Sequence, residues 1–417
     1  MFTTWIIWFM YFASLYFVSF WLLIFLEKGV KEEKKHPKNL PFVTICIPAW
    51  NEEECIAKTV KSALNLNYPV GKREILCIDH SSQDRTAEIL KSFGNKIRVI
   101  TLKRNPGDRK GAAVNAGLKV AKGELFICLD ADSYVTPNAL KIMLPYFEEK
   151  DVASVLPLMK LKEKNTFMRK IQAIEYLVNF FIKKIVGLVD CIHVTPGPFG
   201  AYKTAVLRKV GGFDPTNLTE DQEMAMRLQK ENYKIVQLLD AEVFTTAPKN
   251  YKEFYQQRNR WYQGSVFNLI KYRKMLFNTK YGELGMFHMP MIAVSAGLSI
   301  FFAIFIIYNH MIRPLFNKLY DASYINFNIP FMVGRKAELF SLLDLDYTFL
   351  FFLVALLLGG IVWIVLAHKY TKEKWTVKRI AFIPVYLLVY PFLMSLAWMG
   401  VAMNLARRKN VQWHKAK

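Results

Sequence analysis

The feature that most constrains this chain is a short apolar run that ends abruptly in two carboxylates. Leu125 to Leu129 is rich in strand-forming residues, and Asp130 and Asp132 follow it directly. Such a run predicts a buried strand of an open α/β sheet, which binds ligands at the carboxyl ends of its strands. The acid pair suits one hard cation such as Mg²⁺ or Mn²⁺, which needs only one or two protein carboxylates beside substrate phosphates. The same residues also suit a solvated turn, and the pair alone does not decide between the two.

The part of the chain around this run alternates apolar stretches with helical patterns. Strands are predicted at Phe42–Ile47, Glu74–Asp79, Ile97–Leu102 and Leu125–Leu129, and helices at Ile56–Leu66, Arg85–Phe93 and Ala112–Ala121. This alternation predicts an α/β domain with a doubly wound, mostly parallel sheet. The carboxyl edge of that sheet would gather Asn51, Asp79, Lys110 and the two aspartates. The chain has no GxGxxG or GxxxxGK[ST] loop, so neither a dinucleotide enzyme nor a P-loop enzyme is indicated.

Two later helices have open interpretations. The helix predicted over Thr166–Val189 either packs on the domain or lies on a membrane surface and leads an acceptor toward the spans. The helix predicted over Asp221–Lys230 begins with Glu220 and Asp221. Acids are favoured in a first turn by the helix dipole whether or not they are functional. Position alone therefore does not make either acid catalytic.

A third helix, predicted from Tyr251 onward, carries Gln257, Arg260 and Trp261 at spacings that place them on one face. Arginine offers fixed charge to a diphosphate, and an indole offers a flat surface to a sugar ring. The alternative is that the tryptophan and arginine anchor the helix to lipid headgroups. The stretch Tyr262–Phe277 has that interfacial character.

The two ends of the chain contain candidate membrane spans. Trp5 to Leu26 has no charge and is long enough to cross a bilayer. It lacks the basic start and small-residue cleavage site of a signal peptide, so we interpret it as a retained transmembrane helix. The lysine-rich segment Lys28–Lys38 follows, and the positive-inside rule then places the next domain in the cytoplasm of a multi-pass cell-membrane protein.

Three more spans are predicted at Met286–Tyr308, Tyr347–Ala367 and Ile380–Leu405. One initial and three final spans would put the C-terminus outside, whereas the basic residues from Arg407 onward favour the inside. A re-entrant or interfacial segment within Tyr324–Leu345 would reconcile the two.

The net charge of +22 does not require a nucleic-acid partner. Basic residues cluster beside the spans, at Lys28–Lys38 and Lys369–Arg379, where anionic membrane lipids account for them, and a nucleotide substrate accounts for others. The five cysteines all precede the second span and form no CxxC pair, which indicates apolar fillers of a reduced domain, neither disulfides nor zinc ligands.

Several motifs together resemble the nucleotide-sugar half of family 2 glycosyltransferases with the GT-A fold. They are Ile47-Pro-Ala-Trp-Asn-Glu52, Ile78-Asp-His-Ser-Ser-Gln-Asp-Arg-Thr86, Lys110-Gly and Asp130-Ala-Asp. Three later motifs, Pro196-Gly-Pro-Phe-Gly-Ala-Tyr-Lys203, Thr219-Glu-Asp221 and Gln257-Arg-Asn-Arg-Trp261, resemble the membrane-embedded synthases of chitin, hyaluronan, cellulose and poly-N-acetylglucosamine. One departure is His80-Ser81, where the family often has Asp-Gly.

The resemblance implies a role for each matching residue. The nucleotide sugar would be bound by Ala49, Asn51, Glu52, Asp79, Lys110, Asp130, Gln257 and Arg260. Asp130 and Asp132 would hold Mg²⁺ or Mn²⁺ with the diphosphate. Asp221 would be the general base, with Glu220 as the second choice. Gly197, Phe199 and Trp261 would bind the acceptor.

The expected architecture is thus an α/β GT-A-type nucleotide-sugar domain inserted between transmembrane helices. Its parts are a transmembrane helix (1–27), a basic linker (28–40), the cytoplasmic domain (41–264), an interfacial helix (265–285) and a region with about three spans (286–417). The expected function is processive, inverting extension of a β-linked polysaccharide, favoured as an N-acetylglucosamine polymer, from a UDP-sugar. The alternatives are single transfer to a lipid (ceramide, diacylglycerol or polyprenyl phosphate) and a non-catalytic receptor for nucleotide sugars.

Overall fold

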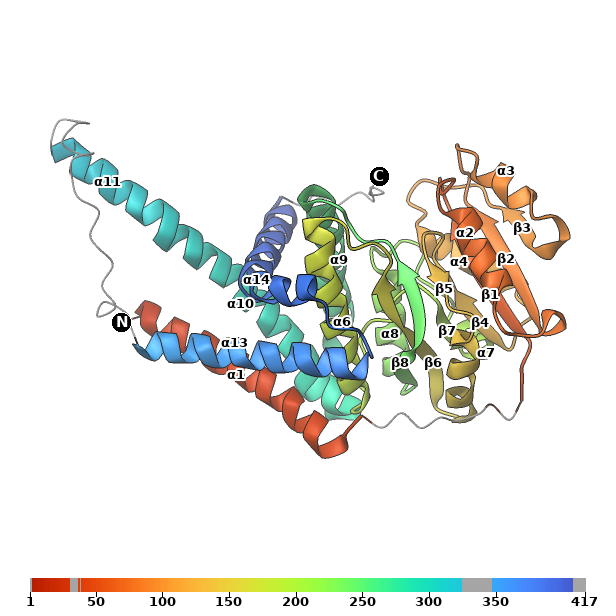
Figure 1. Cartoon of the computed structure of the whole chain (residues 1–417), viewed down its shortest axis with the longest axis horizontal. Coiled ribbons are helices and arrows are strands. Elements are labelled where there is room, and N and C mark those ends of the chain that lie inside the picture. Colours follow the sequence, from red (N-terminus) through yellow and green to blue (C-terminus); the bar gives the residue numbers. More distant parts are fainter. Residues whose placement is uncertain (1, 31–36, 38, 325–346, 408–417) are drawn as a thin grey trace.

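An α/β domain lies beside a group of long apolar helices in the computed structural model of this chain (Figure 1). The structure describes residues 2–30, 37, 39–324 and 347–407. The expected segment Tyr324–Leu345 therefore falls almost entirely outside the described residues. So do most of the basic linker and the residues that follow Arg407.

The domain is built on one eight-stranded sheet in the order β3-β2-β1-β4-β7-β6-β8-β5. The strands are β1 Val43–Ala49, β2 Arg73–Asp79, β3 Arg98–Thr101, β4 Leu125–Cys128, β5 Tyr134–Val135, β6 Val152–Leu161, β7 Gly200–Lys203 and β8 Lys234–Thr245. β1 to β4 are parallel to one another, as the sequence predicts. The sheet as a whole is mixed, because β7 pairs antiparallel with both β4 and β6, and β5 pairs antiparallel with β8.

Helices connect the strands and cover the sheet. They are α2 Ile56–Leu64, α3 Thr86–Lys91, α4 Lys110–Val120, α5 Ala139–Met143, α6 Phe167–Gly187, α7 Thr204–Lys209, α8 Glu220–Lys230 and α9 Tyr251–Lys271. α2 illustrates why they form, since Ile56, Val60 and Ala63 recur at helical spacing and are all buried against the sheet. The core of the domain is therefore set by the same periodicity that predicted its elements.

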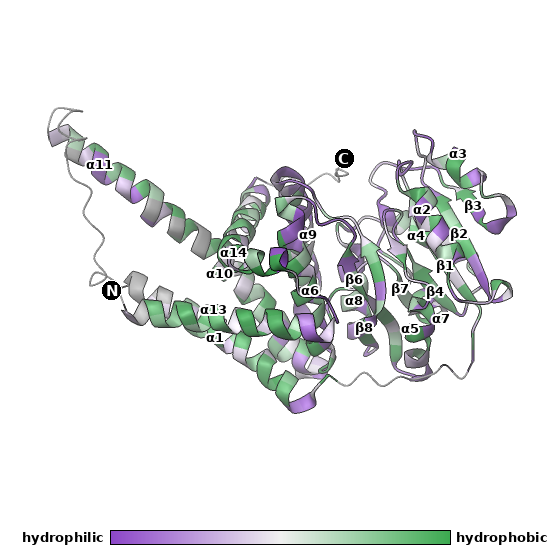
Figure 2. Ribbon diagram, viewed as in Figure 1, coloured by the Kyte–Doolittle hydropathy of each residue, from purple (hydrophilic) through white to green (hydrophobic). Residues whose placement is uncertain are grey.

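Four helices in the described ranges are long and apolar enough to cross a membrane. They contain the candidate spans Trp8–Lys28, Leu284–Phe301, Leu350–Tyr370 and Val377–Ala406. The elements that carry them are α1 Phe2–Lys28, the π-helical turn η6 Leu284–His288 with α10 Met289–Ile307, α13 Tyr347–Tyr370 and α14 Val377–Ala406; α11 Arg313–Tyr324 extends beyond α10. The helices of the four candidate spans are coloured mainly as hydrophobic in Figure 2.

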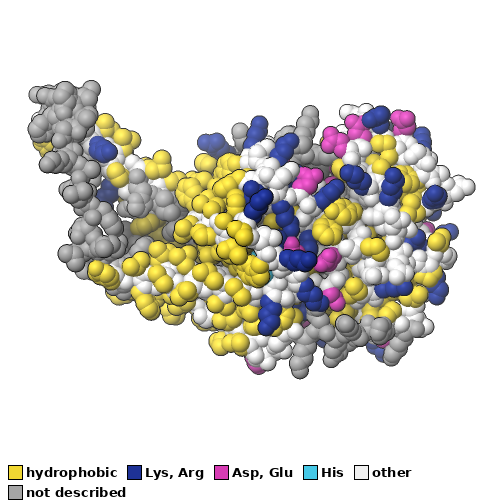
Figure 3. Space-filling model, in the orientation of Figure 1, with side chains coloured by type: hydrophobic (Ala, Val, Ile, Leu, Met, Phe, Trp, Pro, Cys, Tyr) yellow, Lys and Arg dark blue, Asp and Glu magenta, His cyan; other side chains and the backbone are white. Residues whose placement is uncertain are grey.

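Basic side chains mark the border between the two parts of the molecule. Figure 3 shows hydrophobic side chains over the long helices and lysines and arginines where the helices meet the domain. Among the exposed lysines at helix ends are Lys28 in the last turn of α1 and Lys369 in the last turn of α13. This distribution fits a membrane with headgroups at the border.

α6 lies between the sheet and the apolar helices. It packs on β8 from one side and on α1, α13 and α14 from the other. The hydrophobic core accordingly runs without interruption from the sheet through Phe181 of α6 to Phe25 of α1 and Trp363 of α13. The two parts of the chain are thus joined by a shared core.

One expected boundary differs from the structure. The chain was expected to change from the domain to a separate interfacial helix at residue 265, but α9 continues without a break from Tyr251 to Lys271. Gly264, the residue at that boundary, lies inside the helix, at the point where α9 contacts the start of α8. A Cβ atom on Gly264 would overlap the side chain of Thr219. The glycine therefore permits a close helix contact.

Candidate active site

A cavity of about 690 Å³ lies at the carboxyl edge of the sheet, among α6, α8 and α9. Most of the residues singled out from the sequence line it: Ala49, Glu52, Lys110, Asp130, Asp132, Gly197, Glu220, Asp221, Gln257, Arg260 and Trp261. They come from loops after β1 and β4, from α4, from the segment before β7, and from α8 and α9. The fold thus gathers into one space residues as far apart in the chain as Ala49 and Trp261.

The acidic centre of the cavity is organised around Lys110. The Lys110 ammonium forms an ion pair with Asp130 and lies 3.6 Å from Oε1 of Glu220. Burial by itself would lower the pKa of Lys110, but the charges of Asp130 and other nearby groups, including Glu220, together with a hydrogen bond to Asp130, outweigh burial and hold this pKa well above its ordinary value. Burial, reinforced by Asp130 and Glu52, raises the pKa of Asp132 to about 7. A cation at this point would relieve the crowding of carboxylates.

Gly197 allows the side chains of Lys110 and Asp130 to approach the backbone closely. A Cβ atom on Gly197 would overlap Nζ of Lys110 and lie 2.8 Å from both carboxylate oxygens of Asp130. Two residues earlier, the hydroxyl of Thr195 donates a 2.7 Å hydrogen bond to the backbone oxygen of Asp221. This one loop therefore connects the acid at the end of β4 with the first turn of α8.

The first turn of α8 presents two acids in different surroundings. Glu220 is 7% exposed and is held near Lys110. Burial raises the pKa of Glu220, while Lys110 opposes that shift. Asp221 is less buried, lines the cavity, and accepts a 2.8 Å hydrogen bond from the backbone N–H of Gln222 through Oδ1. Asp221 is thus the more available of the two carboxylates.

α9 supplies the opposite wall. Gln257, Arg260 and Trp261 all line the cavity, as their helical spacing predicts. Nη1 of Arg260 donates to the backbone oxygen of Leu218, 3.1 Å away, just before α8. The intervening residue Arg258, which the sequence interpretation did not use, is buried and pairs with Glu175 on α6. The wall is therefore fixed to both α8 and α6.

Two residues predicted to bind the nucleotide lie outside the cavity lining and form hydrogen bonds within its loops. Asp79 is 2% exposed and accepts a hydrogen bond from the backbone N–H of Ser82. Asn51 adopts a left-handed backbone with φ of 55°, and its side-chain oxygen accepts from the backbone N–H of Gln83. Neither is among the lining residues, whereas the neighbouring Trp50 and His80 are. In the described structure Asp79 and Asn51 thus shape the cavity through its loops.

Phe199, which the resemblance implied as an acceptor residue, does not face the cavity. Its side chain is fully buried, and it is absent from the cavity lining. Its backbone has φ of 60°, which is strained for an aromatic residue and occurs next to Gly200 at the start of β7. The turn directs the ring into the core, so the structure leaves Gly197 and Trp261 as the predicted acceptor residues that face the cavity.

Comparison with known proteins identifies the domain. Residues 44–211 match the family described as Glycosyl transferase family 2. The chain contains a family 2 glycosyltransferase domain. This match confirms, for these residues, the resemblance that the sequence motifs indicate.

Among curated relatives of the glycosyltransferase domain, two are named for different products. The chain is 28% identical over 272 residues to a probable glycosyltransferase, YdaM, of Bacillus subtilis (61% of this chain, 62% of the relative). It is 31% identical over 246 residues to the poly-beta-1,6-N-acetyl-D-glucosamine synthase of Staphylococcus epidermidis (58% of each chain). It is 27% identical over 254 residues to a beta-monoglucosyldiacylglycerol synthase of Nostoc sp. (60% of this chain, 54% of the relative). The matches span about 54% to 62% of these relatives' lengths.

The fold also has a solved counterpart. A mannosyltransferase from Pyrobaculum calidifontis, in complex with GDP-Man and Mn²⁺, superposes with a TM-score of 0.60 at 14% identity and covers 96% of each chain. At that identity the likeness concerns the fold. It confirms the expected GT-A-like sheet with apolar helices at both ends of the chain.

The far end of the cavity is apolar and was not anticipated from the sequence. The glycosyltransferase domain meets the long helices there, and Phe180 of α6, Trp21 of α1 and Met291 of α10 are among the lining residues. Within this end His193 and His288 approach each other, with a ring nitrogen of one 2.7 Å from a ring nitrogen of the other. The cavity therefore runs from the acidic centre to the membrane-type helices. Only the folded chain reveals this, because these residues are far apart in sequence.

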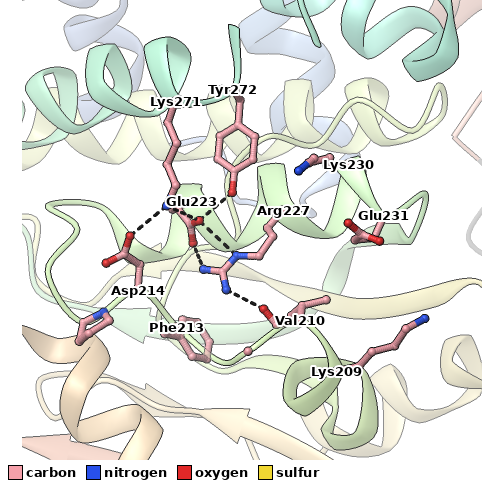
Figure 4. Close-up of a pocket in the computed structure, with 12 residues that line it drawn as sticks. Lys209, Val210, Phe213, Asp214, Glu223, Arg227, Lys230, Glu231, Lys271 and Tyr272 are labelled. Atoms are coloured by element: carbon pink, nitrogen blue, oxygen red, sulfur yellow. Dashed lines mark hydrogen bonds and ion pairs between the residues drawn. The ribbon is translucent and has the colours of Figure 1, made fainter. Parts of the chain in front are cut away.

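A second cavity of about 550 Å³ lies on the other side of α8, and its charged side chains hold that helix in place (Figure 4). Glu223 is ion-paired with Arg227 and with Lys271, whose ammonium also lies 3.0 Å from Asp214. The hydroxyl of Tyr272 donates to Glu223 at 2.7 Å. These contacts hold α8 against the end of α9. They therefore fix the position of Asp221, in the first turn of α8, relative to the main cavity.

Proposed function

We propose that this chain is a membrane-embedded inverting glycosyltransferase that transfers a sugar from a UDP-sugar to an acceptor hydroxyl. The observation that carries the proposal is the single cavity that joins Asp130 and Lys110 with Asp221 and Trp261. A donor diphosphate needs cationic and metal-binding groups, and an acceptor needs a base and a surface on which a sugar can stack. Both sets line one space, which supports direct transfer between two bound substrates.

Asp130 and Asp132 would hold Mg²⁺ or Mn²⁺. Two carboxylates at the end of a strand are a sufficient protein contribution for either ion when substrate phosphates complete the coordination. Both aspartates line the cavity, which fits this assignment, and the fold neighbour's complex with Mn²⁺ supports it. The bound ion would neutralise charge that develops on the departing diphosphate.

In the proposed reaction, Asp221 accepts the proton of the acceptor hydroxyl as its oxygen attacks the anomeric carbon. A bond forms between this oxygen and the carbon, and the bond from the carbon to the diphosphate breaks, so UDP leaves with the electron pair. Because a single displacement occurs, the configuration at the carbon inverts. Lys110 and Arg260 would provide fixed positive charge to the diphosphate. Glu220 is the weaker candidate for the base because Lys110 already lies 3.6 Å from it.

The favoured acceptor is a growing β-linked N-acetylglucosamine polymer. The relative with poly-beta-1,6-N-acetyl-D-glucosamine synthase in its name supports this choice, as does the indole of Trp261 in the cavity wall. A stacked ring is held through its apolar face and can advance without breaking directional bonds.

A lipid acceptor is the second candidate, because the far end of the cavity is lined by Trp21, Phe180 and Met291. Apolar side chains beside membrane-type helices suit an acyl or prenyl chain, and a relative is named for glucosylation of diacylglycerol. We further propose that α1, α10, α13 and α14 cross the membrane and that the domain faces the cytoplasm. The exposed lysines at the ends of α1 and α13 support that orientation.

The function is tested with the purified full chain in lipid nanodiscs. Labelled UDP-N-acetylglucosamine, UDP-glucose and UDP-galactose are each supplied with Mn²⁺ or Mg²⁺, and released UDP, insoluble polymer and lipid-extractable label are measured. Polymer from UDP-N-acetylglucosamine is the expected result. One sugar per lipid would replace the favoured acceptor with the second. Binding of UDP-sugars without release of UDP in any mixture would mean a nucleotide-sugar receptor and would overturn the proposal.

A further inference from the structure

Arg258 is a fully buried cation that lies behind the cavity wall and is not itself one of the lining residues. It lies on α9 between Gln257 and Arg260 and is 1% exposed. Its Nη2 atom donates hydrogen bonds of 2.6 and 2.7 Å to the two carboxylate oxygens of Glu175. Glu175 is itself 3% exposed, lies on α6 and lines the cavity. The pair thus bridges the two helices that flank the candidate acceptor space.

The guanidinium of Arg258 is also stacked against aromatic rings. Its central carbon lies 4.3 Å from the ring centre of Trp261 and 4.8 Å from that of Phe254. These residues follow one another at helical spacing, so the guanidinium covers the indole from the protein side. Trp261 nevertheless lines the cavity, so the indole remains in contact with the space assigned to the acceptor.

Packing alone does not explain why an ion pair occupies this buried position. Removing two charges from water is costly, and well-packed apolar residues often replace a buried ion pair without loss of stability. The planar guanidinium, however, offers a flat partner to the indole, and the two bonds to Glu175 restrict its position. An apolar pair would fill the volume but would not hold the ring from behind in the same way.

We propose that Glu175 and Arg258 are positioning residues that fix the orientation of Trp261 for the acceptor sugar or headgroup. The inference rests on the proposed glycosyl transfer and deepens it. Neither residue touches the reacting atoms. Both act through the indole, which presents one face to the guanidinium and keeps its exposed part toward the acceptor.

Loss of this support should lower the rate of transfer to the acceptor more than the rate of donor hydrolysis. Water needs no stacking surface, so hydrolysis of the donor should not depend on the orientation of Trp261. Transfer to an acceptor should depend on it strongly, because a displacement of about 1 Å in a reacting group can cost about 100-fold in rate. The ratio of transfer to hydrolysis therefore reports positioning, whereas a general loss of folding would lower both rates together.

The decisive variant is the double substitution Glu175→Leu with Arg258→Met, which removes both charges and refills the volume. It is measured in nanodiscs beside Trp261→Ala, with the donor that the wild type consumes and with an N-acetylglucosamine tetrasaccharide or diacylglycerol as acceptor. We expect melting and donor hydrolysis close to wild type and a transfer rate about 10- to 100-fold lower, with a raised acceptor KM. The triple variant that adds Trp261→Ala should lose little more, because the residues act as one unit.

A second variant, Arg258→Lys, keeps the charge for Glu175 but lacks the planar group. It guards against failure of the double variant to fold, and we expect its transfer-to-hydrolysis ratio to fall as well. A wild-type ratio in a folded double variant, or in Arg258→Lys when the double variant does not fold, would overturn the inference. The inference would also be overturned if the loss of transfer in the triple variant equalled the product of the losses in the double variant and in Trp261→Ala. Failure of the proposed function is separate, since the wild type itself would then release no UDP.

Discussion

The ammonium of Lys110 is ion-paired with Asp130 and lies 3.6 Å from the carboxylate of Glu220, so one cation joins the end of β4 to the first turn of α8. These acids are ninety positions apart in the chain. Without the lysine their charges would repel across a buried space, where electrostatic interactions are weakly screened. Lys110 thus allows the proposed donor-binding acid and the proposed base region to share one cavity, and several predictions depend on that geometry.

The metal prediction concerns Asp130 and Asp132. Asp130→Asn and Asp132→Asn each remove charge from a predicted ligand while preserving its shape, and excess EDTA should stop transfer by the wild type. Loss of a supporting partner of a metal ligand typically costs about 10- to 100-fold in affinity, and loss of the ligand itself should cost at least that much. Titration of Mn²⁺ against UDP release measures the effect. Undiminished turnover in excess chelator would mean that transfer does not need a divalent metal ion.

Gly197 should tolerate no side chain. In Gly197→Ala the new methyl group would displace Lys110 and crowd both oxygens of Asp130, so the donor KM should rise about 10-fold, which corresponds to ~1.4 kcal/mol. Gly71→Ala is the matched control, because a Cβ atom there meets nothing within 4 Å. Equal donor KM values for the two variants would show that the space beside Asp130 is not used by the donor.

Glu373 should stabilise the junction between the domain and the long helices. Lys164 and Arg379 lie 2.9 and 2.8 Å from one of its oxygens, and Lys160 lies 3.1 Å from the other. Burial alone would raise the pKa of Glu373, but these cations hold it below its ordinary value. Glu373→Gln should cost about 1 to 3 kcal/mol of stability at neutral pH.

The pH dependence of this effect follows from the direction of the pKa shift. A depressed carboxyl pKa contributes stability that is fully present above the unfolded pKa of about 4.3 and is lost as the pH falls through the lower folded pKa. The difference in melting temperature between wild type and Glu373→Gln should therefore shrink below about pH 4. Exposed Glu231→Gln serves as control. A difference that grew in acid would contradict the assignment.

The local elements were predictable because their signals are local. The run Leu125–Leu129 predicted β4. Because parallel strands place their carboxyl ends at one edge of the sheet, Asp130 was expected at the ligand-binding edge. The spacing of Gln257, Arg260 and Trp261 likewise predicted one shared face, and the structure has all three in the cavity lining. Periodicity is enough to decide such features.

Features that depend on distant contacts were not predictable. β7 enters the sheet antiparallel between β4 and β6, and no sequence period encodes that pairing. Phe199 resembled an acceptor residue, but its left-handed backbone turns the ring inward. Arg258 finds Glu175 83 residues away. Each of these is a property of tertiary packing.

The most direct test of the central claim compares Asp221→Asn with Glu220→Gln in the same nanodisc assay. Asp221→Asn removes a base and keeps its shape, so UDP and Mn²⁺ should bind as in the wild type while kcat for transfer falls by about 100- to 10,000-fold. Glu220→Gln should weaken donor binding by loosening Lys110 and retain measurable transfer. If Asp221→Asn instead keeps most of its kcat while Glu220→Gln loses it, then Asp221 is not the base and the proposed arrangement of the site is wrong.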